Sequence, residues 1–208
     1  MNIEYIPIGI DCDVAFMCKE FKLRNFAYPF DHIVTYNGIT DILKNNFDNF
    51  IPEIHENTIN NHILNKKYNT KFIHDNFLLD QEKEKYKRRI NRFLETLDNY
   101  NKLPNNKIIF IKKGHSIHHH NETDNIINEY NEIKDFNYFL KNNYKNLNYE
   151  IKIILLCKQC NKNIKDENIE NIKLYKYNDI PTVENQFQNT LITKAYFKNL
   201  FEIIIIDK

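Results

Sequence analysis

The stretch YIPIGIDCDVAF, residues 5–16, joins an apolar run to a segment with helical spacing, and Gly9 lies at the junction. Glycine is rare in this chain. A usual content of ~7% would give about 15 glycines, whereas the chain of 208 residues has 3. Gly9 therefore indicates a tight exit from a strand. In α/β proteins, ligands bind where strands give way to helices, so this junction is a candidate site.

Five short runs rich in isoleucine and aromatic residues predict strands. They are YIPIGI (5–10), KIIFIKK (107–113), EIKIILL (150–156), IKLYKY (172–177) and FEIIIID (201–207). Helical spacing occurs at residues 13–23, 39–50, 82–100, 124–144 and 183–200. The alternation predicts one α/β domain over residues 1–208, with a largely parallel sheet of about five strands flanked by helices. The strand signal fades from Asp31 to about Lys83, where we expect helices and loops that cap one edge of the sheet.

Charge and hydropathy argue against two classes of partner. With 29 Lys and Arg residues against 28 Asp and Glu residues, the net charge of +1 lacks the basic excess that binding to nucleic acid requires. The longest apolar runs are far shorter than the ~20 residues of a membrane-spanning helix, so we expect no membrane partner. The first strand follows no basic and apolar leader, and four cysteines in such a chain are typical of a reducing compartment. We therefore expect a cytoplasmic protein.

Motifs for bound cofactors and metals are weak or missing. The sequence has no P-loop, dinucleotide-binding fingerprint or GxSxG elbow, and we expect no cofactor. CKQC (157–160) is half a zinc site and lacks the Trp and Gly-Pro of the thioredoxin motif. His115 and the run His118–His120 could bind zinc, copper or nickel through their imidazoles, or form a solvated loop. Their spacing matches no zinc motif, and we expect no metal there.

Cys12 opens the helix that follows Gly9. Unpaired backbone N–H groups and the positive end of the helix dipole favour a thiolate at this position, which suits a nucleophile. Asp11 and Asp13 lie on either side, and either carboxylate could raise the pKa of the thiol or cap the helix. Alternatively, Cys12 is a small buried hydrophobic residue beneath the helix.

Two histidines are candidates for the base that a thiol nucleophile needs. His115 follows Gly114 at the end of the strand predicted at 107–113, the same kind of position as the candidate nucleophile. His74 stands beside Asp75 after an apolar pair. Adjacent residues of a strand point to opposite faces, so Asp75 is not expected to orient His74 directly. The sequence favours neither histidine.

The opening segment PIGIDCDVAFMCKEFKLRNFAYPFDHIV (7–34) combines an apolar strand, a Gly-x-x-Cys turn, an alanine three residues after the cysteine, and Tyr-Pro-Phe-Asp. In these features it resembles the family of "putative papain-like cysteine peptidases" of unknown function found in bacteria and large DNA viruses. His32 stands where that family has an aromatic residue, usually Trp. The segments FIHDNF (72–77), YKRRINRF (86–93) and IIFIKKGH (108–115) are similar to the family as well, so the resemblance covers most of the chain.

The resemblance implies that Cys12 is a nucleophile and that a downstream histidine is its base. In a cysteine-dependent hydrolase of the peptidase or acyl-transfer type, Cys12 would attack a carbonyl carbon, and His115 or His74 would take the thiol proton. Backbone N–H groups at the helix start would hold the oxyanion. Asp31 or Asp75 would orient the imidazole. A papain fold sets a helical half against an antiparallel barrel, unlike the parallel sheet predicted above, so we take the family name to describe the dyad and not the fold.

We expect a peptide or small-molecule substrate to contact Gly9, Asp11, Tyr28 and Arg89. The alternative is a non-catalytic α/β module that binds a small ligand or sugar at the same strand ends, with YPFD and KRRINR as walls. A dyad requires the sulfur of Cys12 to lie within hydrogen-bond reach of a histidine nitrogen, or one water away, which separates the two interpretations. The sequence does not indicate the oligomeric state.

Overall fold

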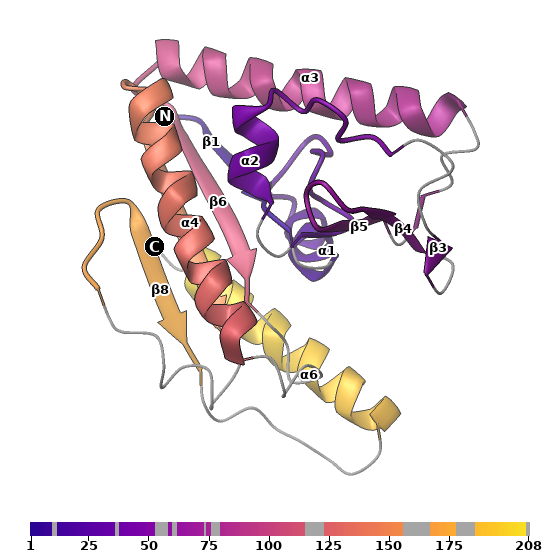
Figure 1. The fold of residues 1–208 in the computed structure, drawn as a ribbon. Helices are drawn as coiled ribbons and strands as arrows, with labels where there is room; N and C mark the ends of the chain where they lie inside the picture. The colour runs from indigo at the N-terminus through magenta and orange to yellow at the C-terminus, as the bar shows by residue number, and fades with distance from the viewer. Residues whose placement is uncertain are drawn as a thin grey trace.

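The computed structural model describes residues 1–9, 12–35, 38–52, 58–59, 62–72, 74–75, 80–114, 123–155, 167–177 and 186–206. Two sheets and several helices occupy these ranges (Figure 1). The helices are α1 (Asp13–Glu20), α2 (Ile39–Lys44), α3 (Asp80–Lys102), α4 (Thr123–Asn143) and α6 (Gln186–Phe201). None of the helices in the described ranges is long and apolar enough to cross a membrane.

The larger sheet has four parallel strands in the order β1-β6-β7-β8. They are β1 (Ile3–Pro7), β6 (Lys107–Lys113), β7 (Tyr149–Leu155) and β8 (Ile172–Lys176). The prediction of a parallel sheet flanked by helices is confirmed, with four strands instead of about five. The run FEIIIID is not a strand, because Glu202–Ile206 form a π-helical turn that continues α6. No turn residue separates this run from the helix, and the helical path buries Ile204 and Ile205 in the core.

A second, smaller sheet lies in the region where helices and loops alone were expected. Its antiparallel strands follow the order β2-β5-β4-β3. They are β2 (Ile33–Thr35), β5 (Thr70–Phe72), β4 (His62–Asn65) and β3 (Thr58–Ile59). Each strand has only two to four residues, which is too short to show an alternating pattern and explains why the strand signal fades there.

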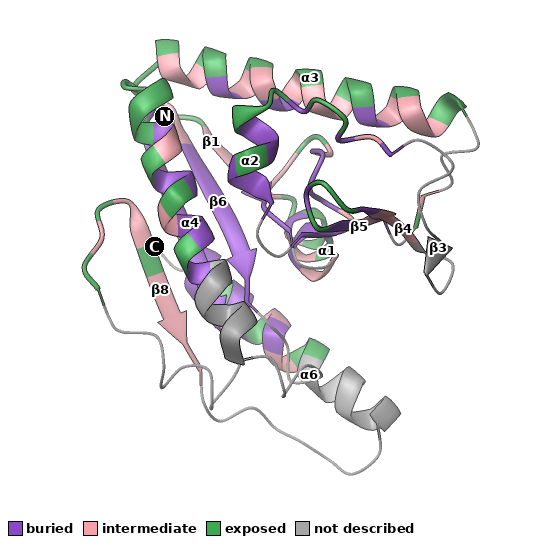
Figure 2. Cartoon of the chain, viewed as in Figure 1, coloured by how far each residue is buried: buried purple, intermediate pink, exposed green. Residues whose placement is uncertain are grey.

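Helices cover both faces of the parallel sheet (Figure 1). One face packs against α2, α3, α4 and the small sheet, and its core includes Ile108 and Phe110 of β6. The other face packs against α1 and α6, and its core includes Ile109 and Ile111. Successive side chains of a strand point to opposite faces, so a strand covered on both sides is apolar throughout. Figure 2 accordingly shows β6 buried over nearly all its length.

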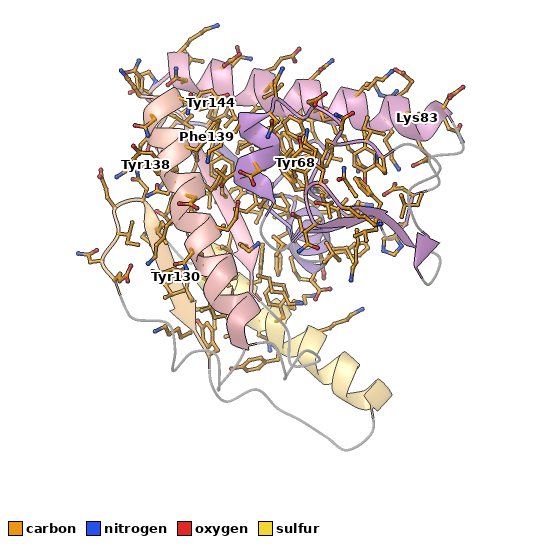
Figure 3. The ribbon with its side chains drawn as sticks, viewed as in Figure 1. Tyr68, Lys83, Tyr130, Tyr138, Phe139 and Tyr144 are labelled. Atoms are coloured by element: carbon orange, nitrogen blue, oxygen red, sulfur yellow. The ribbon has the colours of Figure 1, made fainter. Side chains whose placement is uncertain are left out.

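The aromatic residues of α4 show how this helix packs (Figure 3). Phe139 and Tyr144, which directly follows the helix, lie together near α3, with ring centroids 6.4 Å apart. Tyr138 projects away from the core and is exposed. One side of α4 is therefore apolar and faces the sheet and α3, as the helical spacing predicts.

Candidate functional site

The turn after β1 is built around Gly9, whose φ of +74° lies in the left-handed region that favours glycine. A Cβ atom at this position would lie 2.6 Å from Cγ2 of Thr35, at the end of β2. The predicted tight exit from the strand is confirmed, and the close approach leaves no room for a larger residue. The turn brings the ends of β1 and β2 together.

Cys12 directly precedes α1 and occupies its N-cap position. Its carbonyl accepts a hydrogen bond from the backbone N–H of Phe16 at 2.9 Å, and the residue is half-buried. The second cysteine of this segment, Cys18, is fully buried, and burial raises the pKa of its thiol to about 12. Of these two thiols, only that of Cys12 lies at the helix N-terminus, where a thiolate is favoured.

The first residue of α1, Asp13, forms an ion pair with Lys113, the last residue of β6. The Lys113 side chain is 4% exposed and that of Asp13 is 20% exposed. The ammonium of Lys113 also lies 5.0 Å from the centre of the Phe197 ring. The pair joins the residue after Cys12 to the strand that leads toward the predicted base.

Gly114 follows β6 and is held against β7. Its backbone N–H donates to the carbonyl of Ile154 at 2.7 Å, and a Cβ atom would overlap the side chain of Leu155. His115 comes next in the chain and lies outside the described residues. The same is true of other residues singled out from the sequence, namely Asp11, His118–His120, Cys157 and Cys160. Among the residues that the structure does describe, no group of three or more His, Cys, Asp or Glu is arranged to hold a metal ion.

Asp31, predicted to orient the imidazole, is fully buried in the loop between α1 and β2. Its Oδ2 accepts a hydrogen bond from the backbone N–H of Tyr28 at 3.1 Å and pairs with Arg24. Burial raises the pKa of Asp31, and the Arg24 guanidinium opposes that rise. Within the described part of the chain, these partners are a backbone N–H and an arginine, not an imidazole, so Asp31 closes the YPFD turn.

Tyr28, predicted to contact the substrate, points into the core. Its hydroxyl donates to Oε1 of Glu4 at 2.8 Å, and burial raises its pKa. Glu4 is near the start of β1, roughly 16 Å from Gly9 at a rise of ~3.3 Å per residue. The structure therefore does not bring the Tyr28 hydroxyl to the end of the strand at which Cys12 lies.

His74 and Asp75 lie between β5 and α3, and His74 is exposed. The carboxylate of Asp75 accepts hydrogen bonds from Lys85 Nζ at 2.6 Å and from the Tyr86 hydroxyl at 2.7 Å. Although burial acts to raise the pKa of Asp75, these hydrogen bonds outweigh it and lower the pKa. Asp75 is thus bonded to α3, in keeping with the expectation that it does not orient His74.

His32 lies against α1 and was not considered as a site residue from the sequence. Its ring contacts that of Phe16, with centroids 5.6 Å apart. Burial and the positive charges of Arg89 and Arg24 lower the pKa of His32 to about 4, so the imidazole is neutral near pH 7. Phe16 is about one helical turn from Cys12. The signal in the sequence was the position of this histidine directly after YPFD.

Arg89 of α3, predicted to contact the substrate, lies close enough to His32 to affect its pKa. Its guanidinium lies 5.3 Å from the centre of the Tyr86 ring. Its Nη1 is buried and has no hydrogen-bond partner among the described residues. A guanidinium N–H without a partner can donate a hydrogen bond to a carboxylate or carbonyl oxygen.

Lys112 lies on the face of β6 opposite to that of Lys113. It was not identified as a candidate from the sequence. Lys112 is 1% exposed, and its Nζ has no hydrogen-bond partner in the described part of the chain. On the same face, Glu132 of α4 accepts hydrogen bonds at Oε1 from the backbone N–H and the hydroxyl of Thr40, at 2.7 and 2.8 Å. Burial raises the pKa of Glu132, and the positive charge of Lys112 opposes that rise. Two consecutive lysines at the end of an apolar strand were the feature of the sequence that could have indicated a buried charge here.

Residues 3–160 match the family model described as "Putative papain-like cysteine peptidase (DUF1796)". The chain belongs to this family. The match runs from β1 into the CKQC motif, so it includes every residue predicted for the site. No curated protein and no solved structure matches the chain.

In this member of the family, a thiol stands at a helix N-terminus at the edge of a parallel sheet. The first backbone N–H groups of a helix have no partner within it, and the side chain of Cys12 does not cap those of α1. Such donors stabilise a negative charge that develops on a carbonyl oxygen. The arrangement therefore suits attack by a thiolate on a carbonyl carbon.

Proposed function

We propose that the protein is a cysteine-dependent hydrolase of the peptidase or acyl-transfer type, with Cys12 as the nucleophile and His115 as the base. One observation carries the proposal. Cys12 opens α1 next to the end of β6, to which the Asp13–Lys113 ion pair joins this helix. From there the chain passes through Gly114 directly into His115.

The proposed reaction begins with transfer of the thiol proton of Cys12 to the imidazole of His115. The thiolate sulfur bonds to the carbonyl carbon of a peptide or small-molecule substrate, and the carbonyl π electrons move to oxygen. Backbone N–H groups of the first turn of α1 hold this oxyanion. Collapse of the intermediate expels the amine or alcohol, which takes the proton from the imidazolium, and water then hydrolyses the thioester.

The described histidines are weaker candidates for the base. His74 is exposed, and the neighbouring carboxylate of Asp75 is bonded to other residues. His32 has a pKa lowered to about 4, which makes it a poor proton acceptor near pH 7. These properties support His115, which the sequence alone could not separate from His74.

The remaining residues have supporting roles in the proposal. Asp31 and Asp75 hold the surrounding loops, since both carboxylates already bond to groups other than an imidazole. Arg89, which is half-buried on α3, binds an oxygen of the substrate through its guanidinium. Gly9 forms the turn that leads from β1 to Cys12.

Alkylation by limiting iodoacetamide at pH 7, followed by mass mapping, tests the proposal. We expect Cys12 to be labelled before the other three cysteines. His115→Ala should slow the labelling of Cys12 about tenfold or more, because the thiolate loses its imidazolium partner and the pKa of the thiol returns toward about 8.5. His74→Ala is the matched control and should leave the rate unchanged.

A second measurement asks whether the thiol performs acyl transfer. Incubation with p-nitrophenyl acetate should add an acetyl group to Cys12, visible in the intact mass, and Cys12→Ser should not be acylated at this position. Preferential alkylation of Cys157 or Cys160, or an unchanged rate in His115→Ala, would contradict the proposal. A chain that is alkylated at Cys12 but never acylated would favour the non-catalytic binding module instead.

A further inference from the structure

We propose, on the basis of the function proposed above, that Lys113 is a positioning residue for Cys12. It offsets the negative charge of Asp13, which follows Cys12 in the chain, and it holds the first turn of α1 against the end of β6. Lys113 does not itself contact the substrate, since its side chain is only 4% exposed.

Contacts with α1, α6 and β7 hold Lys113 in position. Its ammonium pairs with the carboxylate of Asp13, which lies 100 positions earlier in the chain. The ammonium also lies 5.0 Å from the centre of the Phe197 ring on α6. Its backbone pairs with Ile154 of β7. A buried ammonium held between a carboxylate and an aromatic face has little freedom, so Asp13 and the start of α1 are held with it.

The charge of Asp13 would otherwise act against the proposed nucleophile. A carboxylate near a thiol disfavours the thiolate and raises the pKa of the thiol. An ion pair with Lys113 cancels much of this charge at the position of Cys12. The helix dipole and a histidine can then favour the thiolate, as a cysteine nucleophile requires.

The other described charges packed against α1 act nearer its C-terminal end. They are Lys198 of α6, paired with Glu20, and the group Arg24, Asp31 and Glu4, which affects Cys18. Cys18 is about 9 Å beyond Cys12 along the helix axis. Within the described part of the chain, the Asp13–Lys113 pair is therefore the charged pair at the first turn of α1.

The test is the pH profile of Cys12 alkylation by iodoacetamide, measured on full-length variants. Lys113→Gln removes the positive charge paired with Asp13 and should move the profile upward by ~0.5–1 pH unit, which slows the rate at pH 7 about threefold to tenfold. Asp13→Asn removes the negative charge beside Cys12 while Lys113 keeps its positive charge, and should move the profile downward by a similar amount, which raises the rate. The double variant should return close to the unaltered profile, and Lys113→Arg should retain it.

Opposite shifts from the two partners of one ion pair distinguish an electrostatic role from a structural one, because lost packing would slow both variants. Shifts of the same sign, or no shift in either variant, would overturn the role of Lys113 while Cys12 stays reactive. The proposed function fails separately, if the unaltered chain shows no preferential labelling of Cys12. Should Lys113→Gln not fold, Asp13→Asn at its part-exposed position and Lys113→Arg still decide the question.

Discussion

Lys112 and Lys113 are consecutive residues of β6, nearly equally buried, and they face opposite sides of the sheet. Lys113 meets Asp13 in a direct ion pair, and that carboxylate keeps contact with water. Lys112 shares its face with Glu132, whose carboxylate is buried and bonds to Thr40 instead. The same residue type at neighbouring positions therefore has a direct, water-accessible ion-pair partner on the α1 face, and on the α4 face a buried carboxylate that it affects by charge without a direct bond.

The difference separates the chemistry at the strand end from the stability of the fold. A pair that keeps contact with water can be altered at small cost, because water replaces the missing partner. A buried carboxylate that loses its compensating charge destabilises the folded state strongly. We therefore expect substitutions on the α4 face to change the free energy of unfolding, and substitutions on the α1 face to change the reactivity of Cys12.

The largest effect is expected from Lys112→Met. It leaves the buried Glu132 carboxylate without the positive charge that favours its ionised form, and should lower the free energy of unfolding by about 4 kcal/mol at pH 7.

This loss should depend on pH. Burial raises the pKa of Glu132 in the folded chain, so the folded chain binds this proton more tightly than the unfolded chain does. The free energy of unfolding then falls as pH rises through the raised pKa, and the loss in Lys112→Met should be smaller at pH 5 than at pH 8. Urea denaturation at both pH values measures this.

Lys113→Met is the matched control on the other face. It should lower the free energy of unfolding by only about 1 kcal/mol, because the Asp13 carboxylate can turn toward water. The double variant Lys112→Met with Glu132→Gln should recover most of the loss seen in Lys112→Met. Equal losses from Lys112→Met and Lys113→Met would remove the distinction between the two faces.

The next largest effect is expected from Gly9→Ala, since the turn at Gly9 connects the sheet to the α1 face. The left-handed backbone and the overlap of the new Cβ with Thr35 should together lower the free energy of unfolding by about 3 kcal/mol. Adding Thr35→Ser removes the methyl group that overlaps and should restore part of the loss, leaving the backbone strain. No recovery in this double variant would show that the contact with Thr35 does not constrain the turn.

Thr40→Val should have a smaller effect, confined to the α4 face. It removes the hydroxyl that donates to the Glu132 carboxylate at 2.8 Å, and should lower the free energy of unfolding by about 2 kcal/mol. Thr35→Val is the control, because the Thr35 hydroxyl is buried without a hydrogen-bond partner among the described residues. Thermal denaturation should show a clear loss for Thr40→Val and little change for Thr35→Val, and the reverse order would contradict the hydrogen-bond assignment.

The smallest effect concerns His32, on the α1 side. Its pKa is lowered to about 4 in the folded chain, so the unfolded chain binds the proton more tightly and stability is lost as pH falls from about 6.5 toward 4. His32→Phe should reduce this acid-induced loss by about 1 kcal/mol, a modest amount because the ring is partly in contact with water. Comparing the free energy of unfolding at pH 7 and pH 4.5 for both chains checks it, and equal acid sensitivity would argue against a buried neutral imidazole.

The parallel sheet could be predicted because its central strands are covered on both faces and read as continuous apolar runs. KIIFIKK and EIKIILL became β6 and β7 for this reason. The small sheet could not be predicted, because strands of two to four residues carry no periodicity. An apolar run such as FEIIIID suits a buried strand or a buried helical turn equally well, and the helix before it decides between them.

In the candidate site, too, the features set by neighbouring residues could be predicted, and those set by distant residues could not. Gly9 and Cys12 were predicted because a strand, a turn and a helix start form a local pattern. The pairing of Asp13 with Lys113 joins residues 100 positions apart, and the bond from Thr40 to Glu132 joins residues 92 positions apart. Spacing in the sequence carries no information on such partners, since it is the sheet that places them side by side.

The strand order also determines when each strand can find its partner during synthesis on the ribosome. β1 lies at the edge of the sheet and pairs with β6, where Ile3 is opposite Lys107. At ~5–20 residues per second, a ribosome needs about 5–20 s to reach β6 after it has made β1. β6, α4, β7 and β8 follow one another and can associate as they emerge, whereas β1 must wait for a distant strand. Cys12 is therefore made well before β6, the strand whose end completes its surroundings.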